Sequence, residues 1–315
     1  MMMGVFHFMA VSSFVHDWIR LSSRQNPVNL NPQGRDRSAL SASVASRNSA
    51  DTLMAANRPN GGTTRSQLRS LTTLGLLSVL TSLGTAASAE PRFAVLVFSK
   101  TTGFRHDSIP QGIAAIKALG AEHGFSVDST EDAGRFTAAE LARYRVVVFL
   151  CTTGEILDPG QKTAFEAFIR AGGGFAGIHS ASDTEYQWAW YGRLVGAYFA
   201  DHPQIQPATI HIEDIGHPST KDLPVIWPRT DEWYNFRGNP RGTAHVLATL
   251  DEATYSGGKM GYDHPIAWCQ EIDGGRSWYT AMGHTVESYA EPLFRLHLLG
   301  GIESAAVLGC PAGRR

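Results

Sequence analysis

The chain has 315 residues, a formal net charge of −2 and three cysteines. Residues 90–315 carry no basic cluster, which excludes an electrostatic footprint for nucleic acid. An odd number of cysteines leaves at least one thiol unpaired within the chain. Cys151 and Cys269 both lie in apolar, strand-like runs. We therefore expect both to be buried free thiols.

The N-terminal part of the chain is predicted to precede the folded domain. Residues 1–53 are rich in Ser, Asn and Arg and show no sustained hydrophobic periodicity. This composition predicts either a disordered leader or a miscalled upstream start, with Met54 as the initiator. Residues 54–89 have two arginines, a leucine-rich run and a final Ala-Ser-Ala, which is the pattern of a signal peptide.

We therefore expect the protein to be exported, to the periplasm or the extracellular space, after cleavage near Ala89. The leucine-rich run is shorter than the roughly 20 residues that span a bilayer, so no membrane span is expected. Residues 90–315 then form one α/β domain, because single domains of this class commonly reach about 200 residues or slightly more.

Strand-like and helix-like segments alternate in the first half of this domain. Apolar, β-branched runs predict strands at 93–99, 125–130, 146–151 and 174–179. Mixed polarity and capping signals predict helices at 109–123, from about 137, and at 159–171. This order predicts a doubly wound, mostly parallel sheet with helices on both faces.

The second half is richer in strands than the first. We predict strands at 208–213, 232–236, 244–250, 265–272 and 277–282, and a final helix from about 291. Because no helices separate most of these strands, we expect an antiparallel extension of the parallel sheet. The fold class is therefore α/β.

Histidines recur where predicted strands end. His106 follows the first strand, His179 ends the strand at 174–179, and His284 follows the last strand. Ligands of open α/β sheets bind outside the carboxyl ends of the strands, so these histidines are expected to share a pocket. His179 also lies in the tight turn of GGGFAGIHSASD, where a nucleophile elbow would place a serine or cysteine.

The ordered motifs GFRHDSI, GGGFAGIHSASDT, DHP, DEWYNF, DHPIAW and GRSWYTAMGHT resemble the ThuA-like family, named for trehalose utilisation. The resemblance covers nearly all of residues 93–301. It implies a flavodoxin-like, class I glutamine amidotransferase-like fold and an association with carbohydrate metabolism. It also implies a pocket that contains His106, His179 and His284.

Glutamine amidotransferases need a cysteine at the elbow, because the thiolate is the group that attacks the amide carbon. His179 occupies that position here, and Cys151 ends a different strand. We therefore do not expect glutaminase activity.

The residues leave three mechanisms open. In the first, His179 and His284 perform acid/base chemistry on a carbohydrate or keto-sugar derivative, with Glu232 or Asp183 orienting an imidazole. In the second, histidines hold a divalent metal, although their dispersed spacing matches no metal motif. The candidate metal ligands are His106, His179, His202, His264 and His284. In the third, Ser180 or Ser182 is a nucleophile, although both fit a turn or helix cap better.

Residues near the expected pocket are candidates for binding the small-molecule substrate. They are Gly103, Phe104, Arg105, His106, Trp233, Tyr234 and His264. Arg105 could clamp an anionic group or pair with a carboxylate of the protein. Two other functions remain open, a sugar-binding module without catalysis and a metal-dependent hydrolase of a non-sugar substrate.

Overall fold

The computed structural model describes residues 90–310, so the predicted leader (1–53) and signal peptide (54–89) lie outside the described residues. Eleven strands are present: β1 (Ala94–Phe98), β2 (Ser126–Thr130), β3 (Val146–Leu150), β4 (Gly174–Ile178), β5 (Phe199–Asp201), β6 (Gln206–Ile212), β7 (Ile226–Asp231), β8 (Asn235–Phe236), β9 (His245–Asp251), β10 (Pro265–Ile272) and β11 (Gly275–Thr280). The helices are α1 (Ile109–His123), α2 (Ala138–Leu141), α3 (Pro159–Arg170), α4 (Ala189–Val195) and α5 (Pro292–Glu303). Short 3₁₀ turns lie at Ala133–Arg135, His179–Ser182, Pro240–Gly242, Glu252–Thr254 and Glu287–Ala290, and a π turn at Ser304–Leu308 follows α5.

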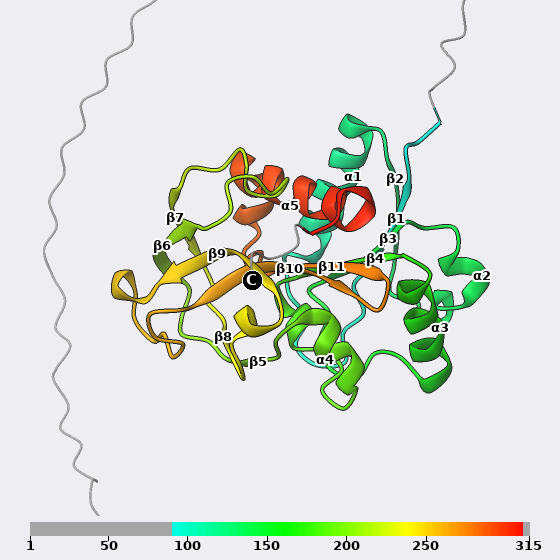
Figure 1. The fold of residues 1–315 in the computed structure, drawn as a ribbon, viewed down its shortest axis with the longest axis horizontal. Coiled ribbons are helices and arrows are strands. Elements are labelled where there is room, and N and C mark those ends of the chain that lie inside the picture. Colours follow the sequence, from blue (N-terminus) through cyan, green and yellow to red (C-terminus); the bar gives the residue numbers. More distant parts are fainter. Residues whose placement is uncertain (1–89, 311–315) are drawn as a thin grey trace, which may run out of the picture. The chain divides into compact units, whose positions relative to one another are not determined.

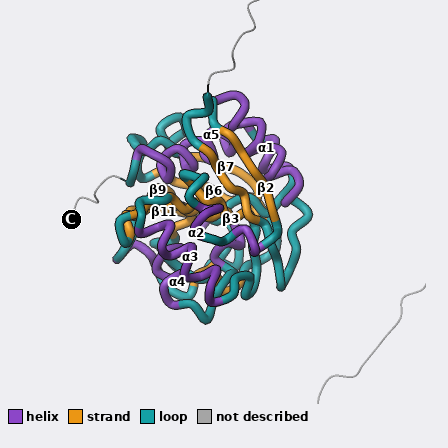
Figure 2. Tube along the Cα trace, turned by 90° about the vertical axis from the view of Figure 1, so that its right-hand side faces the viewer, coloured by secondary structure: helices purple, strands orange, loops and turns teal. Residues whose placement is uncertain are grey.

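Nine strands form one sheet in the order β2-β1-β3-β4-β11-β10-β9-β6-β7. The first five in this order are parallel, and each of the last four is antiparallel to its neighbour. Helices α1 and α5 lie on one face of the sheet, whereas α3 and α4 lie on the other (Figures 1 and 2). The predicted doubly wound sheet with an antiparallel extension is confirmed.

The central strands form the core because helices cover both of their faces. Every residue of β3 (VVVFL) and β4 (GFAGI) is buried. Continuous β-branched and apolar runs are what such doubly covered parallel strands require. Local signals set the helix limits. The carboxylate of Asp158 and the amide of Gln161 form a capping box that starts α3, and Gly124, with a φ of 76°, ends α1.

Only the last two residues of the predicted strand at 232–236 form a strand, β8. The edge strand β7 ends at Asp231, and the short β8 pairs with β5 in a separate two-stranded sheet. Pro228 lies inside β7, where it weakens the strand signal, and proline is tolerated there because β7 is an edge strand. The seven-residue helix α4 was also not predicted.

The antiparallel extension curves back toward the parallel strands. Three strands separate β11 from β7, which would place them about 19 Å apart in a flat sheet. Even so, the backbone N–H of Gly283, just beyond β11, donates to the Asp231 carboxylate at the end of β7 over 2.9 Å. Helix α5 packs against β11 and, through Glu291, forms an ion pair with Arg229 of β7. The curvature brings the carboxyl ends of β7 and β11 together.

Among the described residues, the helices lack the combined length and apolar character that crossing a membrane requires.

The expectation of two buried free thiols is half wrong. Cys151 is a buried free thiol, but Cys269 in β10 forms a disulfide with Cys310. Cys310 lies 41 positions after Cys269 in the sequence, so the spacing of the cysteines alone did not reveal the disulfide.

We expect alkylation of the denatured, unreduced protein to label one cysteine, and all three to be labelled after reduction. Replacing Cys310 with serine should lower the free energy of unfolding by about 2–4 kcal/mol, because the crosslink restricts the unfolded chain. Mass spectrometry of the alkylated protein and urea denaturation would measure both. Two or more labelled thiols without reductant would contradict the disulfide.

Two histidines outside the cluster at the sheet edge are part of the core. His217 precedes α5 in the chain and His297 lies within it, and both are fully buried. Burial lowers the pKa of His217 to about 4 and that of His297 to about 3. Both side chains are therefore neutral in the folded protein at neutral pH.

This burial predicts a stability that depends on pH. Above the ordinary histidine pKa of about 6.5, the two histidines are neutral in both the folded and the unfolded protein. Below it, they become protonated in the unfolded chain but stay neutral in the folded protein. The free energy of unfolding should therefore fall by about 1.4 kcal/mol per pH unit for each histidine as the pH drops from 6.5 toward 4. Urea denaturation at pH 7 and pH 5 would measure it, and His297→Gln should remove one histidine's share. A variant with the parent's slope would contradict the prediction.

Candidate functional site

Four side chains from four different loops converge at the carboxyl edge of the parallel strands. His106 lies between β1 and α1, His179 follows β4, Glu232 follows β7, and His284 follows β11. One nitrogen or carboxylate oxygen of each lies within 4.8 Å of those of the others. The structure therefore brings together the three histidines that the sequence predicted and one of its two candidate carboxylates.

His179 has the backbone of an elbow residue. Its φ is 53°, in the left-handed region that few non-glycine residues adopt, and it opens a 3₁₀ turn (His179–Ser182) directly after β4. Its Nδ1 lies 2.8 Å from the carbonyl oxygen of Ala281. Because a carbonyl can only accept, Nδ1 carries the hydrogen and Nε2 points into the cluster. The predicted elbow at His179 is present.

Glu232 joins the two histidines that end the central strands. Its Oε2 lies 3.1 Å from Nδ1 of His284 and 3.4 Å from Nε2 of His179. Its Oε1 lies 3.0 Å from Nδ1 of His202, a half-exposed side chain at the rim of the cluster. Burial raises the pKa of the Glu232 carboxyl, but the neighbouring imidazoles of His179 and His284 outweigh this effect and hold it well below its ordinary value. Glu232 is therefore an anion at neutral pH.

The other two histidines have opposite electrostatic environments. Burial, together with the neighbouring histidines, lowers the pKa of His106 to about 2, so its imidazole is neutral. Burial also lowers the pKa of His284, but its hydrogen bond to Glu232 and the charge of that carboxylate outweigh this effect and raise it overall. The His284 side chain is 20% exposed, so it is the cluster imidazole that solvent reaches most directly.

Asp231, next to Glu232, positions the His284 loop from behind. Its buried carboxylate accepts hydrogen bonds from the backbone N–H groups of Gly283 and His284 and from the Ser288 hydroxyl, and it pairs with buried Arg229. This role of Asp231 was not predicted from the sequence. The signal in the sequence was the pair of acidic residues Asp231 and Glu232. Neighbouring side chains of an extended chain point to opposite sides, so only one of the two carboxylates can face the cluster.

We expect Asp231→Asn to lower the free energy of unfolding by about 3 kcal/mol, because it removes a buried charge that Arg229 and two backbone N–H groups face. Urea denaturation would measure the change. The matched control is Asp222→Asn, an exposed carboxylate beside Lys221, whose loss should change stability by less than about 0.5 kcal/mol. Equal effects of the two substitutions would show that Asp231 does not hold the loop.

Several predicted residues lie outside the cluster. The Asp183 carboxylate accepts from the Tyr186 hydroxyl at 2.6 Å, so Glu232 is the carboxylate that contacts the histidines. His264 is fully buried, and its two ring nitrogens contact Glu252 and the backbone oxygen of Tyr234. Trp233 is also fully buried, and its indole donates to a backbone carbonyl. These placements favour core roles for His264 and Trp233 over the predicted substrate contacts.

Other predicted contacts lie beside the cluster. The Tyr234 ring packs on His179, with 4.3 Å between ring centres. Phe104 is 66% exposed and places its ring 4.9 Å from that of His106, edge to face. The backbone N–H of Gly103 donates to Thr153, which fixes this loop on the end of β3. Arg105 forms a two-pronged ion pair with Glu131, the structural alternative that the sequence left open.

The candidate nucleophiles are poorly placed for attack. Ser180 and Ser182 are fully buried within the 3₁₀ turn; Ser182 contacts the backbone and Tyr279, and Ser180 lies 3.4 Å from Nδ1 of His106. Cys151 is fully buried at the end of β3, and burial raises the pKa of its thiol to about 12. A thiol that does not ionise is a weak nucleophile.

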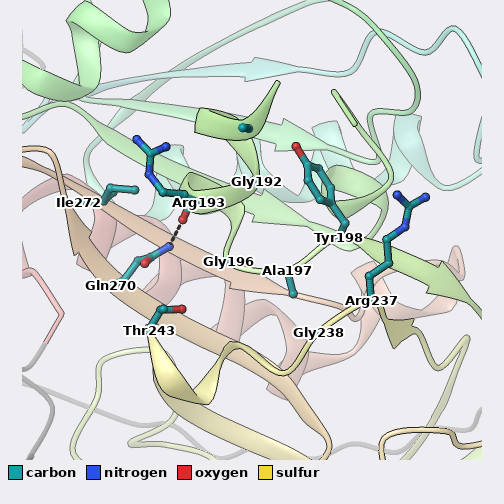
Figure 3. Close-up of a pocket in the computed structure, with 11 residues that line it drawn as sticks. Gly192, Arg193, Gly196, Ala197, Tyr198, Arg237, Gly238, Thr243, Gln270 and Ile272 are labelled. Atoms are coloured by element: carbon teal, nitrogen blue, oxygen red, sulfur yellow. Dashed lines mark hydrogen bonds between the residues drawn. The ribbon is translucent and has the colours of Figure 1, made fainter. Parts of the chain in front are cut away.

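A separate cleft of about 650 Å³ lies between α4 and β10. Figure 3 shows Arg193 and Arg237 on opposite sides of it, and the Gln270 amide hydrogen-bonded to the backbone oxygen of Arg193. Its lining includes none of the four cluster residues and no histidine, cysteine or carboxylate. This cleft therefore lacks the histidines and carboxylates that the cluster offers for acid/base chemistry.

The fold and the site define a flavodoxin-like α/β protein of the class I glutamine amidotransferase-like type, with an imidazole at the elbow where those enzymes have a thiol. The family model ThuA, described as trehalose utilisation, matches residues 94–305, and the chain belongs to this family.

Two solved structures of ThuA-like proteins resemble this one. That of Bacteroides uniformis is 25% identical, with 71% of this chain and 96% of that chain covered and a TM-score of 0.60. That of Parabacteroides merdae is 19% identical, with 71% and 92% covered and a TM-score of 0.59. No curated protein matches the sequence significantly.

Proposed function

We propose that this protein is an enzyme that acts on a carbohydrate or keto-sugar derivative by histidine-based acid/base chemistry. The observation that carries the proposal is the contact of one Glu232 oxygen with both His179 and His284. The description of the family as trehalose utilisation supports the substrate class. We also propose that it is not a glutaminase, since the elbow carries His179 and the Cys151 thiol is buried.

The arrangement suits proton transfer at a sugar hydroxyl or at a carbon next to a carbonyl. Imidazole exchanges protons near neutral pH, and the anionic Glu232 stabilises the protonated form of a neighbouring imidazole. His284 is partly open to solvent, whereas His179 is held by the Ala281 carbonyl. We assign His284 as the residue that exchanges the proton with the substrate, and His179 and Glu232 as its partners.

Exposed groups at the rim offer contacts for the substrate. Phe104 presents an exposed ring beside His106, and a ring of this kind can cover the apolar face of a sugar. His202 is half exposed, and its Nδ1 lies 3.0 Å from Oε1 of Glu232 and 2.9 Å from the carbonyl oxygen of Pro203. Phe104 therefore borders one member of the cluster and His202 another, and a small saccharide bound over the cluster would meet both an aromatic surface and imidazoles.

We further propose that the protein is exported, as the sequence of residues 54–89 suggests. The disulfide between Cys269 and Cys310 supports this, because disulfides persist mainly in oxidising compartments.

The test is turnover of disaccharides and their keto derivatives by the parent and two variants. We expect His179→Asn and His284→Ala to lower kcat by about 100-fold or more, the usual contribution of a general acid or base. Asparagine is chosen at position 179 because it tolerates the left-handed backbone there. His211→Ala is the control, since this surface histidine faces Asp251, away from the cluster.

Thermal melting with and without saccharide separates this proposal from its rivals. Variants that lose activity but keep the parent's Tm support a catalytic role, whereas an equal loss of both would make the two histidines structural. A saccharide that raises the Tm of the parent without any turnover would identify a sugar-binding module instead. Turnover of a non-sugar substrate alone would contradict the assignment to carbohydrates.

A further inference from the structure

The proton positions of the cluster leave one contact unexplained. Nδ1 of His179 carries its hydrogen, because it faces the carbonyl oxygen of Ala281 at 2.8 Å. In a neutral ring, Nε2 then carries a lone pair and no hydrogen. This lone pair lies 3.4 Å from an oxygen of anionic Glu232 and 3.1 Å from Nδ1 of His284. A lone pair and a carboxylate repel each other unless a positive charge lies between them.

A metal ion at the centre of the cluster would supply that charge. A hydrogen on Nδ1 of His284 can serve the contacts of this nitrogen with His179 and Glu232, but it leaves the contact between His179 and Glu232 without a hydrogen. The His106 ring also lies close to both other imidazoles, with its centroid 4.7 Å from that of His179 and 5.0 Å from that of His284. One cation shared by four ligand atoms would satisfy these contacts together.

The distances between the ligand atoms also fit a metal. Nε2 of His179, Nδ1 of His284 and Oε2 of Glu232 are separated by 3.1, 3.4 and 3.1 Å. Ligands about 2.0–2.1 Å from a metal are about 3.3 Å apart in a tetrahedron and about 2.9 Å apart when adjacent in an octahedron. The three observed separations lie in or next to this interval. His106 brings the fourth ligand atom within 4.8 Å of the others.

We propose that His106, His179, Glu232 and His284 bind one divalent transition-metal ion, with Zn²⁺ as its representative. Imidazole nitrogen and carboxylate oxygen are ligands for this class of ion. Its catalytic meaning rests on the proposed action on a carbohydrate, because the ion would occupy the same site. With the ion bound, His179 and His284 would serve as ligands in place of exchanging protons, and the ion would polarise a hydroxyl or carbonyl oxygen of the substrate.

The contacts around the four residues match those of metal ligands. Metal-bound histidines usually donate their second ring N–H to a carbonyl or carboxylate, which is what His179 does toward Ala281. The second oxygen of Glu232 contacts His202, and Asp231 holds the backbone of His284. The His284 and His202 side leaves the cluster partly open, as a metal that binds substrate requires.

The experiment uses the full chain without a polyhistidine tag, stripped with a chelator that is then removed. Isothermal titration with Zn²⁺ should show one tight equivalent, and elemental analysis of the unstripped protein should show bound divalent metal. Glu232→Gln and His284→Ala should each raise the Kd by about 100-fold or more, since even changes next to ligands cost about 10–100-fold. His211→Ala should bind like the parent.

The Tm of the stripped parent should also rise with Zn²⁺, which tests the proposal even if a variant fails to fold. Absence of a stoichiometric site in the parent, or parent-like affinity in Glu232→Gln, would overturn the metal site. Saccharide turnover by fully stripped protein would also overturn a catalytic metal while leaving the proposed function intact. Conversely, a protein that binds Zn²⁺ at this site but neither binds nor converts saccharides would contradict the function and not the metal site.

Discussion

The buried carboxylate of Asp231 is the interaction on which the site depends. It connects the last residue of β7 to the backbone of Gly283 and His284 beyond β11, and these strands are far apart in the sheet order. These hydrogen bonds hold the end of β7 beside the His284 loop and so place Glu232 near the histidines. Asp231 and Glu232 are adjacent in the chain but have different partners. Asp231 neutralises buried Arg229 behind the loop, and Glu232 faces the cluster. A structural ion pair thereby places the carboxylate of Glu232 in the cluster.

The backbone conformation just beyond β11 also fixes the position of His284. Gly283 has a φ of 110°, and a Cβ there would lie 2.8 Å from the hydroxyl of Tyr289. Only glycine satisfies both the conformation and the close approach. The next residue, His284, is thus set by a turn that cannot move easily and by two hydrogen bonds to one carboxylate. Such preorganisation keeps Nδ1 of His284 on Glu232 without help from a ligand.

The sequence predicted the parallel half of the fold well because its strands are buried on both faces, as β3 shows. It predicted the histidines of the site because all three follow strands of that half or its neighbour β11. It could not show that Glu232 would reach them, since the curvature that joins β7 to β11 comes from packing around α5 and not from any local pattern. Pro228 further concealed β7. The pairing of Cys269 with Cys310 is likewise a contact between distant segments.

Local rules fail at the candidate site, as they do at a few other positions such as Glu185 and Asp273. His179 adopts a left-handed backbone that its side chain does not favour, and three imidazoles and a carboxylate crowd into a largely buried volume. Both features oppose stability, because strained residues cost about 1–3 kcal/mol each and buried polar groups must be satisfied in pairs. A fold that needed only a core would place apolar side chains there. The strain and buried polarity at these four residues support the proposed function, since proteins often violate local rules where they bind or react.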